Sequence, residues 1–543
     1  MREGLNQAAA VLDRRTFIAR LSGATAAAMA ATSGGVLRPV ALAGQEGSAE
    51  RRRERAFQIR LEAAKRAASR PMPANLGSGD EARYPNRIGS YSKALPHNQL
   101  GEVDPAAYQS LLDALESGDP ADFERIRMGL GQKLTNPQAG LAFDLEGPDP
   151  GHIDMPPAPP LDSPAAAADL SEVYWMALCR DVAFGEYEAD PLIAEAAADL
   201  SRLQGFFGPK SGNRVTPGTI FRGDTLGDSI GPYLSQFLWL DIPMGAVRVA
   251  QRMTTLMPGR EYMTSYDQWL DIQNGLVVTQ DPPDPTPRYI RNLRDLSQWV
   301  HVDALYQAYH QACLILLGLG APTADGDPYK RSETQIGFAT LGGPHILTLV
   351  TEVATRALKA VWYQKWLVQR RLRPEAMAGL VHQTRTGMAR RPLDDQIVNS
   401  LAVDRTAEAH RSYLLPQAWP EGSPTHPSYG AGHGTVAGAC VTMLKAYFDE
   451  SFVIPNPVVA DRTGLSLLPY SGPALTVGNE LNKLAYNVAL GRNAGGVHYR
   501  SDAYHSVRLG ERIAAGIMEE QKACFNEQIG FAFTSFDGQP IRI

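Results

Sequence analysis

Cysteine is scarce in this chain, with four residues in 543 and no Cys-x-x-Cys pair. A small fold held by disulfides is therefore excluded, and neither a clustered zinc site nor a thioredoxin-like redox motif is supported. Aromatic residues make up only 8% of the chain, while 44% of it is hydrophobic, which is ample for a large core. We expect the four cysteines to be buried small apolar side chains; they are Cys179, Cys313, Cys440 and Cys524.

The chain also has no strong excess of positive or negative charge. The 52 basic and 58 acidic residues leave a net charge of −6 without a long block of either sign, so nothing predicts binding to nucleic acid. After the first forty residues no run of 18 apolar residues occurs, so we expect no membrane span. A globular protein that binds small molecules is the class that remains.

The N-terminal segment has the pattern of an export signal. Arg14 and Arg15 precede a weakly apolar, alanine-rich stretch, and Ala41-Leu42-Ala43 offers a small-residue cleavage site. We therefore predict a twin-arginine signal over residues 1–43 and a periplasmic or extracellular location. The alternative is a disordered N-terminus with an incidental arginine pair.

The remaining chain divides by composition into an N-terminal arm or oligomerisation segment over residues 44–100 and an α-helical domain over residues 101–543. The proline-rich stretch Asn136–Pro164 reads as a surface loop, since it cannot continue a helix. Strand-like alternation is confined to Ser451–Val459 and the last dozen residues. We predict a mainly α helical-bundle fold with long irregular loops and few short strands. Apolar residues at three and four spacing predict helices over these ranges: 50–70, 165–184, 230–252, 296–317, 344–372, 434–448, 477–490 and 503–525.

Three separated motifs carry candidate chemistry. In the first, Lys365 and Arg373 lie eight residues apart at the end of a helical pattern that Pro374 terminates. On a straight helix they would point in different directions, so they can meet one ligand only if the chain turns inward there. A solvated basic turn that complements the helix dipole is the alternative.

The second motif is a small-residue loop that leads into a helix. It contains His426 and ends in Ala431-Gly432-His433, so backbone N–H groups could approach an oxyanion at the helix N-terminus. The third motif combines Arg492 with His498 and Asp502. At i, i+4 on a helix the carboxylate could fix the imidazole tautomer and leave the other nitrogen free as a ligand or nucleophile.

Together the motifs offer one pocket three permanent cations and two imidazoles without an accompanying carboxylate cluster. Such a pocket suits a compact tetrahedral oxyanion such as phosphate or vanadate, and an ordinary two-metal phosphatase is disfavoured. Each imidazole could instead be a structural histidine, and each motif alone could arise by chance.

The order Lys-x7-Arg-Pro, Pro-Ser-Tyr-x-x-Gly-His and Arg-x5-His-x3-Asp resembles the vanadium-dependent haloperoxidases, which share their site with type-2 phosphatidic acid phosphatases. The likeness to the red-algal and cyanobacterial bromoperoxidase branch extends to further segments, namely Ser90–His97, Gly101–Pro105, Phe221–Thr225, Gly231–Leu238 and Gly343–Leu347. The resemblance implies two four-helix bundles and a homo-oligomer, either a dimer or a dodecamer. It also implies a vanadate cofactor and, as substrates, hydrogen peroxide, a halide (bromide above all) and a small organic molecule.

The resemblance also implies roles for individual residues. His498 would be the axial vanadium ligand, Arg373 and Arg492 would balance charge on the oxygens, and Gly432 would donate its backbone N–H. Two further residues would take part in the reaction, since Lys365 would balance charge and polarise bound peroxide and His433 would be the acid–base group. His426 matches the histidine of the bromoperoxidases. Trp362 would line the site, and Asp502 would support His498.

One position departs from the family pattern. Ala431 stands where a serine is expected to bond an oxyanion oxygen, so oxyanion binding would be weaker unless another group replaces that hydroxyl. Two alternatives to a haloperoxidase follow. In an exported acid phosphatase, His498 would attack phosphorus and His433 would protonate the leaving group; the third reading is a noncatalytic or vanadium-independent homologue. A structural calcium site is a further expectation, at Asp325-Gly326-Asp327 near Gln335.

Overall fold

The computed structural model describes residues 46–543, and the predicted export signal over residues 1–43 lies outside them. The chain separates into two compact units, Met1–Lys65 and Arg66–Ile543. Of the first unit the structure describes one stretch of helix, which belongs to α2 (Glu46–Ser69) and confirms the helix predicted there. The predicted boundaries at residues 100 and 101 stay predictions.

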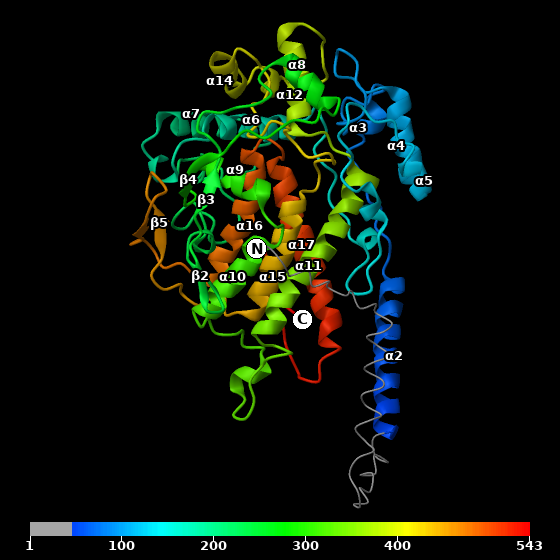
Figure 1. Cartoon of the computed structure of the whole chain (residues 1–543), viewed down its shortest axis with the longest axis vertical. Helices are drawn as coiled ribbons and strands as arrows, with labels where there is room; N and C mark the ends of the chain where they lie inside the picture. The colour runs from blue at the N-terminus through cyan, green and yellow to red at the C-terminus, as the bar shows by residue number, and fades with distance from the viewer. Residues whose placement is uncertain (1–45) are drawn as a thin grey trace, which may run out of the picture. The chain divides into compact units, whose positions relative to one another are not determined.

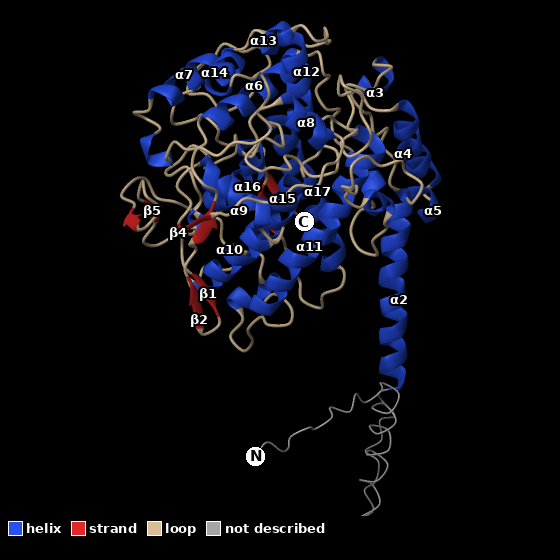
Figure 2. Ribbon diagram, turned by 45° about the horizontal axis from the view of Figure 1, so that its top comes forward, coloured by secondary structure: helices blue, strands red, loops and turns tan. Residues whose placement is uncertain are grey.

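Helices dominate the second unit, as predicted, and the strands are short pieces at its periphery (Figure 2). Its α-helices are α3 (Asp80–Arg83), α4 (Pro105–Ser117), α5 (Pro120–Phe123), α6 (Pro164–Leu178), α7 (Pro191–Leu200), α8 (Tyr266–Gln273), α9 (Leu293–Val302), α10 (Gln307–Gly318), α11 (Gly343–Tyr363), α12 (Pro374–Thr386), α13 (Asp395–Val398), α14 (Leu401–His410), α15 (Gly432–Tyr447), α16 (Val477–Ala494) and α17 (Arg500–Lys522). A π-helical stretch, η7 (Gln364–Gln369), continues α11. No helix in residues 46–543 is both long and apolar enough to cross a membrane.

The strands form four antiparallel pairs of two. They are β1 (Ile242–Met244) with β2 (Val247–Val249), β3 (Met253–Thr255) with β4 (Asp284–Arg288), β5 (Val458–Ala460) with β6 (Leu467–Pro469), and β7 (Ala532–Thr534) with β8 (Pro540–Arg542). The strands expected near Ser451–Val459 and at the C-terminus are therefore present. Those between residues 242 and 288 were not expected.

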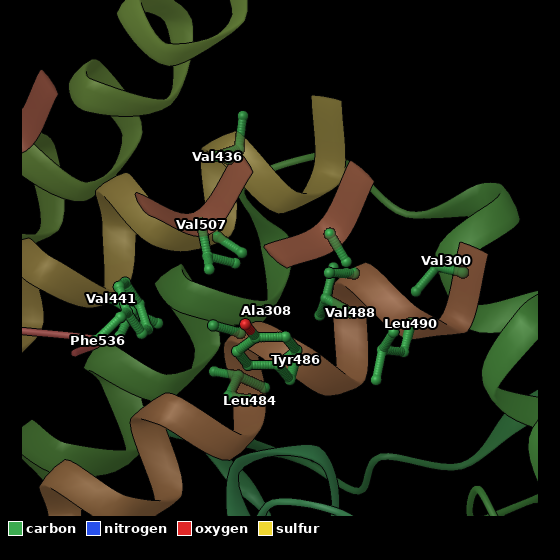
Figure 3. Packing of buried hydrophobic residues seen from close by; sticks show 14 of the residues in the cluster. Val300, Ala308, Val436, Val441, Leu484, Tyr486, Val488, Leu490, Val507 and Phe536 are labelled. Carbon is green, nitrogen blue, oxygen red and sulfur yellow. The ribbon is translucent and has the colours of Figure 1, made fainter. Parts of the chain in front are cut away.

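Helix α15 lies at the centre of the main bundle. It packs against α11, α16 and α17, and the four helices run side by side in Figure 1. All but one residue of α15 is buried, because apolar and small side chains surround the helix. Figure 3 shows part of this core, to which Val441 of α15, Val507 of α17 and Val488 of α16 contribute side chains. A second group forms where α12, α13 and α14 pack on α6.

Several sequence expectations are wrong in detail. The helix predicted over 230–252 is instead an irregular chain followed by β1 and β2, because Pro232 and Pro243 interrupt it and Gly231 has a φ of 70°. The segment 296–317 is two helices, α9 and α10. Helices α4, α7, α8, α12 and α14 were missed. Cys179, Cys313 and Cys440 are buried as expected, but Cys524 is exposed.

Candidate functional site

The end of α11 brings the first motif together. After Tyr363 the chain continues as the π-helical stretch η7, and Arg370 then takes a left-handed conformation with φ 37°. Arg373 follows as the N-cap of α12. The chain thus turns inward between Lys365 and Arg373, as their spacing required. Both side chains are buried, which excludes the solvated basic turn.

The loop before α15 supplies acceptors for both cations. Nζ of Lys365 donates to the carbonyl oxygens of Pro427 at 2.7 Å and Ser428 at 2.9 Å. Nε of Arg373 donates to the carbonyl oxygen of His426 at 2.9 Å, and its NH2 lies 2.9 Å from Nδ1 of the same residue. The first and second motifs therefore form one site.

Arg373 also joins this loop to the third motif. Its NH1 donates to the carbonyl oxygen of Val497 at 2.7 Å and lies 3.0 Å from Nε2 of His498. The other ring nitrogen of His498, Nδ1, lies 2.7 Å from Oδ2 of Asp502. The carboxylate thus holds the Nδ1 proton and leaves Nε2 with its lone pair directed toward the cations.

The pairing of His498 and Asp502 is confirmed, but not in the helical setting expected for it. His498 precedes α17, whose N-cap is Tyr499, and only Asp502 lies in the first turn. Asp502 accepts further bonds from the backbone N–H of Tyr499 at 3.2 Å and from NH1 of Arg371 at 2.7 Å. Burial raises its pKa, but Arg371 and His498 outweigh burial and hold the pKa well below its usual value.

Arg492 completes the cationic set from the end of α16. Its NH1 donates to the carbonyl oxygen of Val300 at 2.8 Å, and its guanidinium lies 4.9 Å from the ring centre of Trp419. Its buried Nε has no hydrogen-bond partner within the described part of the chain. Burial lowers the pKa of Arg492 to about 10, and the nearby Arg373 contributes in the same direction.

The electrostatics show a pocket short of negative charge. Burial and the Arg373 guanidinium lower the pKa values of Lys365 and His498 well below normal, and burial lowers the pKa of Arg373 to about 10. Burial and Lys365 likewise hold the pKa of His426 well below its usual value. A bound oxyanion would supply the missing charge and reverse these shifts.

His433 lies on the first turn of α15, beside the pocket. Its Nε2 is 3.0 Å from Oδ1 of Asp303, which follows the last residue of α9. Sequence reasoning missed Asp303, since it lies 130 residues away and no local pattern marks it. Asp303 also acts on Arg492, where it favours the charged form, so one carboxylate serves both residues.

Trp362 and His426 pack together as one wall near Lys365, and the roles predicted for them in the reaction stay predictions. Their ring centres are 4.8 Å apart, and Nζ of Lys365 lies 5.7 Å from the Trp362 ring. A side chain at Gly432 would place its Cβ 3.2 Å from Trp362, so glycine permits the close approach of the α15 N-terminus to this wall. The predicted site residues are therefore assembled on three neighbouring segments.

Ala431 is the N-cap of α15 and is fully buried. Its backbone N–H donates to Oγ of Ser506 on α17 at 2.7 Å, a contact that the sequence did not reveal. The side chain of Ser506 thus fixes the loop. Its hydroxyl contacts the backbone of Ala431 and is not at the position where the family serine would stand.

The expected calcium loop shows other contacts. Asp325 pairs with Lys330 at 2.8 Å, and Asp327 accepts from the backbone N–H of Tyr329 at 2.9 Å. Among residues 46–543 no group of three or more His, Cys, Asp or Glu side chains could hold a metal ion. The calcium site stays a prediction.

The donor set fits a tetrahedral oxyanion. Lys365 uses two of its three ammonium protons on loop carbonyls, and Arg492 has the unpartnered Nε described above. NH1 of Arg373 lies 3.0 Å from Nε2 of His498, the ring nitrogen that keeps a lone pair and can coordinate a metal. Cations that donate hydrogen bonds and an imidazole with a free lone pair together suit a tetrahedral oxyanion such as phosphate or vanadate.

Comparisons with known proteins agree with this geometry. Residues 345–527 match a family model described as the VCPO second helical-bundle domain. A vanadium-dependent bromoperoxidase of Corallina officinalis is 38% identical over 589 residues, covering 91% of this chain and 98% of that protein. The vanadium-dependent bromoperoxidase of Ascophyllum nodosum is 36% identical over 527 residues, covering 91% of this chain and 92% of that protein.

A solved structure supports the same assignment. The homohexameric second vanadate-dependent bromoperoxidase of Ascophyllum nodosum superposes with a TM-score of 0.87 and 31% identity, covering 91% of this chain and 90% of its own. Identity above 30% over almost the whole of these relatives establishes the relationship. The chain belongs to the family of vanadium-dependent bromoperoxidases.

Proposed function

We propose that this protein is a vanadate-dependent peroxidase that oxidises bromide with hydrogen peroxide. Bromide loses two electrons, peroxide is reduced to water, and the hypobromous acid formed halogenates small organic molecules. The observation that carries the proposal is Nε2 of His498, which keeps its lone pair because Asp502 holds Nδ1. It faces a pocket in which Lys365, Arg373 and Arg492 donate to carbonyl oxygens and form no ion pair within the described residues.

In this function the chain binds and orients the oxyanion. His498 would hold vanadium through Nε2, while Lys365, Arg373 and Arg492 would neutralise the oxygens and Gly432 would donate a backbone N–H. When bound, vanadate supplies a Lewis acid that activates peroxide without a change of oxidation state. The relatives' names and the unpartnered donors described above support this assignment.

His433 would move the proton. With the Nε2 proton given to Asp303, its Nδ1 keeps a lone pair that can accept a proton from hydrogen peroxide. Asp303 would then stabilise the imidazolium. Lys365 would polarise the bound oxidant toward attack by the halide, because its third N–H remains for a ligand.

Reconstitution tests the function directly. The metal-stripped protein should gain peroxide-dependent bromination of a dye when vanadate is added, and phosphate should compete with vanadate for the site. Hydrolysis of p-nitrophenyl phosphate is the control for the phosphatase alternative. Full peroxidase activity without vanadate, or vanadate binding with hydrolysis alone, would reject the proposal.

A homo-oligomer belongs to the same proposal. The homohexameric relative supports it, as do two large apolar side chains on the surface, Phe143 and Leu145, with exposed fractions of 83% and 105%. Light scattering on the purified protein should give a mass at least twice that of its polypeptide, which is 58.9 kDa for the full 543 residues, and a dimer or a dodecamer is the assembly we expect. A monomer would contradict this part.

We also propose export by the twin-arginine route, which the residues Arg14-Arg15 and Ala41-Leu42-Ala43 support. Changing both arginines to lysine should retain the protein in the cytoplasm. Unaltered export of that variant would assign the N-terminus another role.

A further inference from the structure

A second buried polar cluster lies behind the site. Nζ of Lys93 donates to Oε1 of Glu375 at 2.6 Å and to the carbonyl oxygens of Glu421 at 2.6 Å and Ser423 at 2.7 Å. All three ammonium protons are therefore used. Lys93 and Glu375 are 2% and 1% exposed, so this is an ion pair removed from water.

Glu375 holds the same stretch of loop from its other side. Its Oε2 accepts the backbone N–H of Ser423 at 2.6 Å, and its Oε1 accepts the hydroxyl of Ser423 at 2.7 Å. Gly422 has a φ of 64°, and a Cβ there would lie 2.1 Å from Oε2 of Glu375. The loop over residues 421–423 is thus pressed against the first turn of α12.

This anchored loop continues directly into the site. Three to five residues beyond Ser423 come His426, whose carbonyl and ring contact Arg373, and the carbonyls of Pro427 and Ser428 that hold Lys365. Glu375 itself lies two residues after Arg373. One ion pair therefore ties the segment that bears Arg373 to the segment that holds Lys365.

The reason for such an anchor is electrostatic. Lys365 is buried near Arg373, and the hydrogen-bond partners of its ammonium among the described residues are two neutral carbonyls. The cost of removing this charge from water therefore opposes the buried position, and the loop that bears the carbonyls must be held in place. Bonds to a charged partner are stronger than bonds to a neutral one. A charged anchor outside the pocket can fix the loop without adding a carboxylate that would repel the oxyanion.

We propose that Lys93 and Glu375 are positioning residues that hold the 421–428 loop, and with it Lys365 and His426, in the geometry that binds the oxyanion. The inference deepens the proposed function and rests on it for the identity of vanadate. It concerns affinity for a tetrahedral anion, so inorganic phosphate can serve as an independent probe.

The chain offers a matched control in a second buried pair. Nζ of Lys483 donates to Oε1 of Glu480 at 2.6 Å and to the carbonyl oxygen of Ile230 at 2.7 Å, with exposed fractions of 1% and 0%. Glu480 likewise accepts a loop N–H, that of Gln236, at 2.8 Å. This pair lies near the start of α16, about 14–18 Å along the helix from Arg492.

The experiment compares two double variants, Lys93→Met/Glu375→Leu and Lys483→Met/Glu480→Leu. Replacing both partners leaves no lone buried charge, and such replacements often preserve stability. Dissociation constants for vanadate and for phosphate are measured on the metal-free proteins by calorimetry, and thermal unfolding is recorded in parallel. The single variant Glu375→Gln, which keeps acceptor and donor atoms near Ser423, serves as the conservative variant.

We expect the first double variant to bind both anions about 10–100-fold more weakly, the typical effect of losing a residue that supports a ligand. In the second double variant, the dissociation constants for vanadate and for phosphate should each change less than twofold. This difference in affinity should persist even if the two double variants have the same melting temperature. The affinity of the Glu375→Gln variant for both anions should lie between that of the first double variant and that of the unaltered protein.

Equal losses of affinity in both double variants would reduce the role of Lys93 and Glu375 to general stability and overturn the inference. So would unchanged affinity in a folded Lys93→Met/Glu375→Leu protein. Failure of the unaltered protein to bind vanadate while it still binds phosphate would reject the proposed function alone, since the comparison of the two double variants then proceeds with phosphate.

Discussion

Arg371 and Arg373 lie two residues apart and are both buried, yet their surroundings are opposite. Arg371 pairs with Asp502 at 2.7 Å and Asp169 at 3.2 Å and stacks 3.9 Å above the Tyr499 ring. These carboxylates outweigh burial and raise its pKa. Arg373 contacts two carbonyl oxygens and two imidazole nitrogens, and burial lowers its pKa to about 10.

The difference separates a cation that serves the fold from one that serves a ligand. The positive charge of Arg371 is balanced by carboxylates of the protein, whereas that of Arg373 would be balanced by a bound anion. The same contrast distinguishes Arg500, which forms a buried pair with Glu172 at 2.6 Å, from Arg492, whose Nε lacks a partner among the described residues. A buried cation whose hydrogen bonds within the described residues go to neutral groups is therefore the structural mark of this site.

The largest effect should come from removing the proposed vanadium ligand beside these cations. His498→Ala should abolish vanadate retention after gel filtration, because it removes the only protein atom proposed to bond vanadium. His310→Ala on α10, outside the pocket, is the control. Retention of vanadate at an unchanged dissociation constant would assign His498 a structural role.

His433 should instead affect the reaction and not the binding. His433→Ala should leave vanadate bound but slow bromide oxidation about 10²–10⁴-fold, the usual contribution of a general acid–base group. Steady-state rates and vanadate calorimetry on the same sample give both quantities. If this substitution and His498→Ala changed only the melting temperature, the two histidines would be structural.

Two substitutions test whether Arg371 serves stability and Arg373 serves anion binding. Arg371→Met should lower the free energy of unfolding by about 3–5 kcal/mol, because it leaves Asp502 and Asp169 unpaired. Arg373→Met should cost far less stability but weaken phosphate or vanadate binding by about 1.5–3 kcal/mol for a lost charged hydrogen bond. Chemical denaturation and calorimetry measure the two. Equal stability losses would show that the arginines do not differ in role.

Ala431→Ser would sharpen the comparison by adding a neutral donor to the cationic pocket. If the hydroxyl reaches the oxyanion, vanadate binding should tighten by about 1–3 kcal/mol, and activity should rise mainly at limiting vanadate. A serine at the N-cap can also stabilise α15 without ligand, so unfolding of the metal-free protein is the control. Greater stability with unchanged affinity would mean that the hydroxyl caps the helix only.

The smallest effect concerns pH. The pKa of Lys365 lies well below normal, and those of Arg373 and Arg492 are about 10. A bound dianion favours the protonated forms and raises these pKa values, so phosphate affinity should fall as pH rises and protons leave the free pocket. Calorimetry between pH 8 and 10, where phosphate remains a dianion, should show proton uptake on binding. Constant affinity across this range would contradict the proposed role of these cations in binding.

Much of the site could be predicted because its residues carry chemistry that local patterns reveal. The pairing of His498 with Asp502 follows from spacing, and the inward turn between Lys365 and Arg373 follows from their requirement to meet one ligand. Asp303, Ser506 and Lys93 could not be found in this way, since each reaches the site from a distant segment through tertiary packing. The chain over residues 230–241, which is irregular apart from the 3-10 helix Gln236–Leu238, was wrongly predicted as an α-helix because its buried apolar residues have helix-like spacing.

The π-helical stretch η7 has a consequence for how this site can vary. A wide turn holds one more residue than an α-helical turn in the same length, so it acts as a stored insertion within the polypeptide. Deleting one residue there would shorten the chain between Lys365 and Arg373 and shift the inward turn that brings the two cations together. The length of chain between Lys365 and Arg373 is therefore as much a part of the site as the two cations themselves.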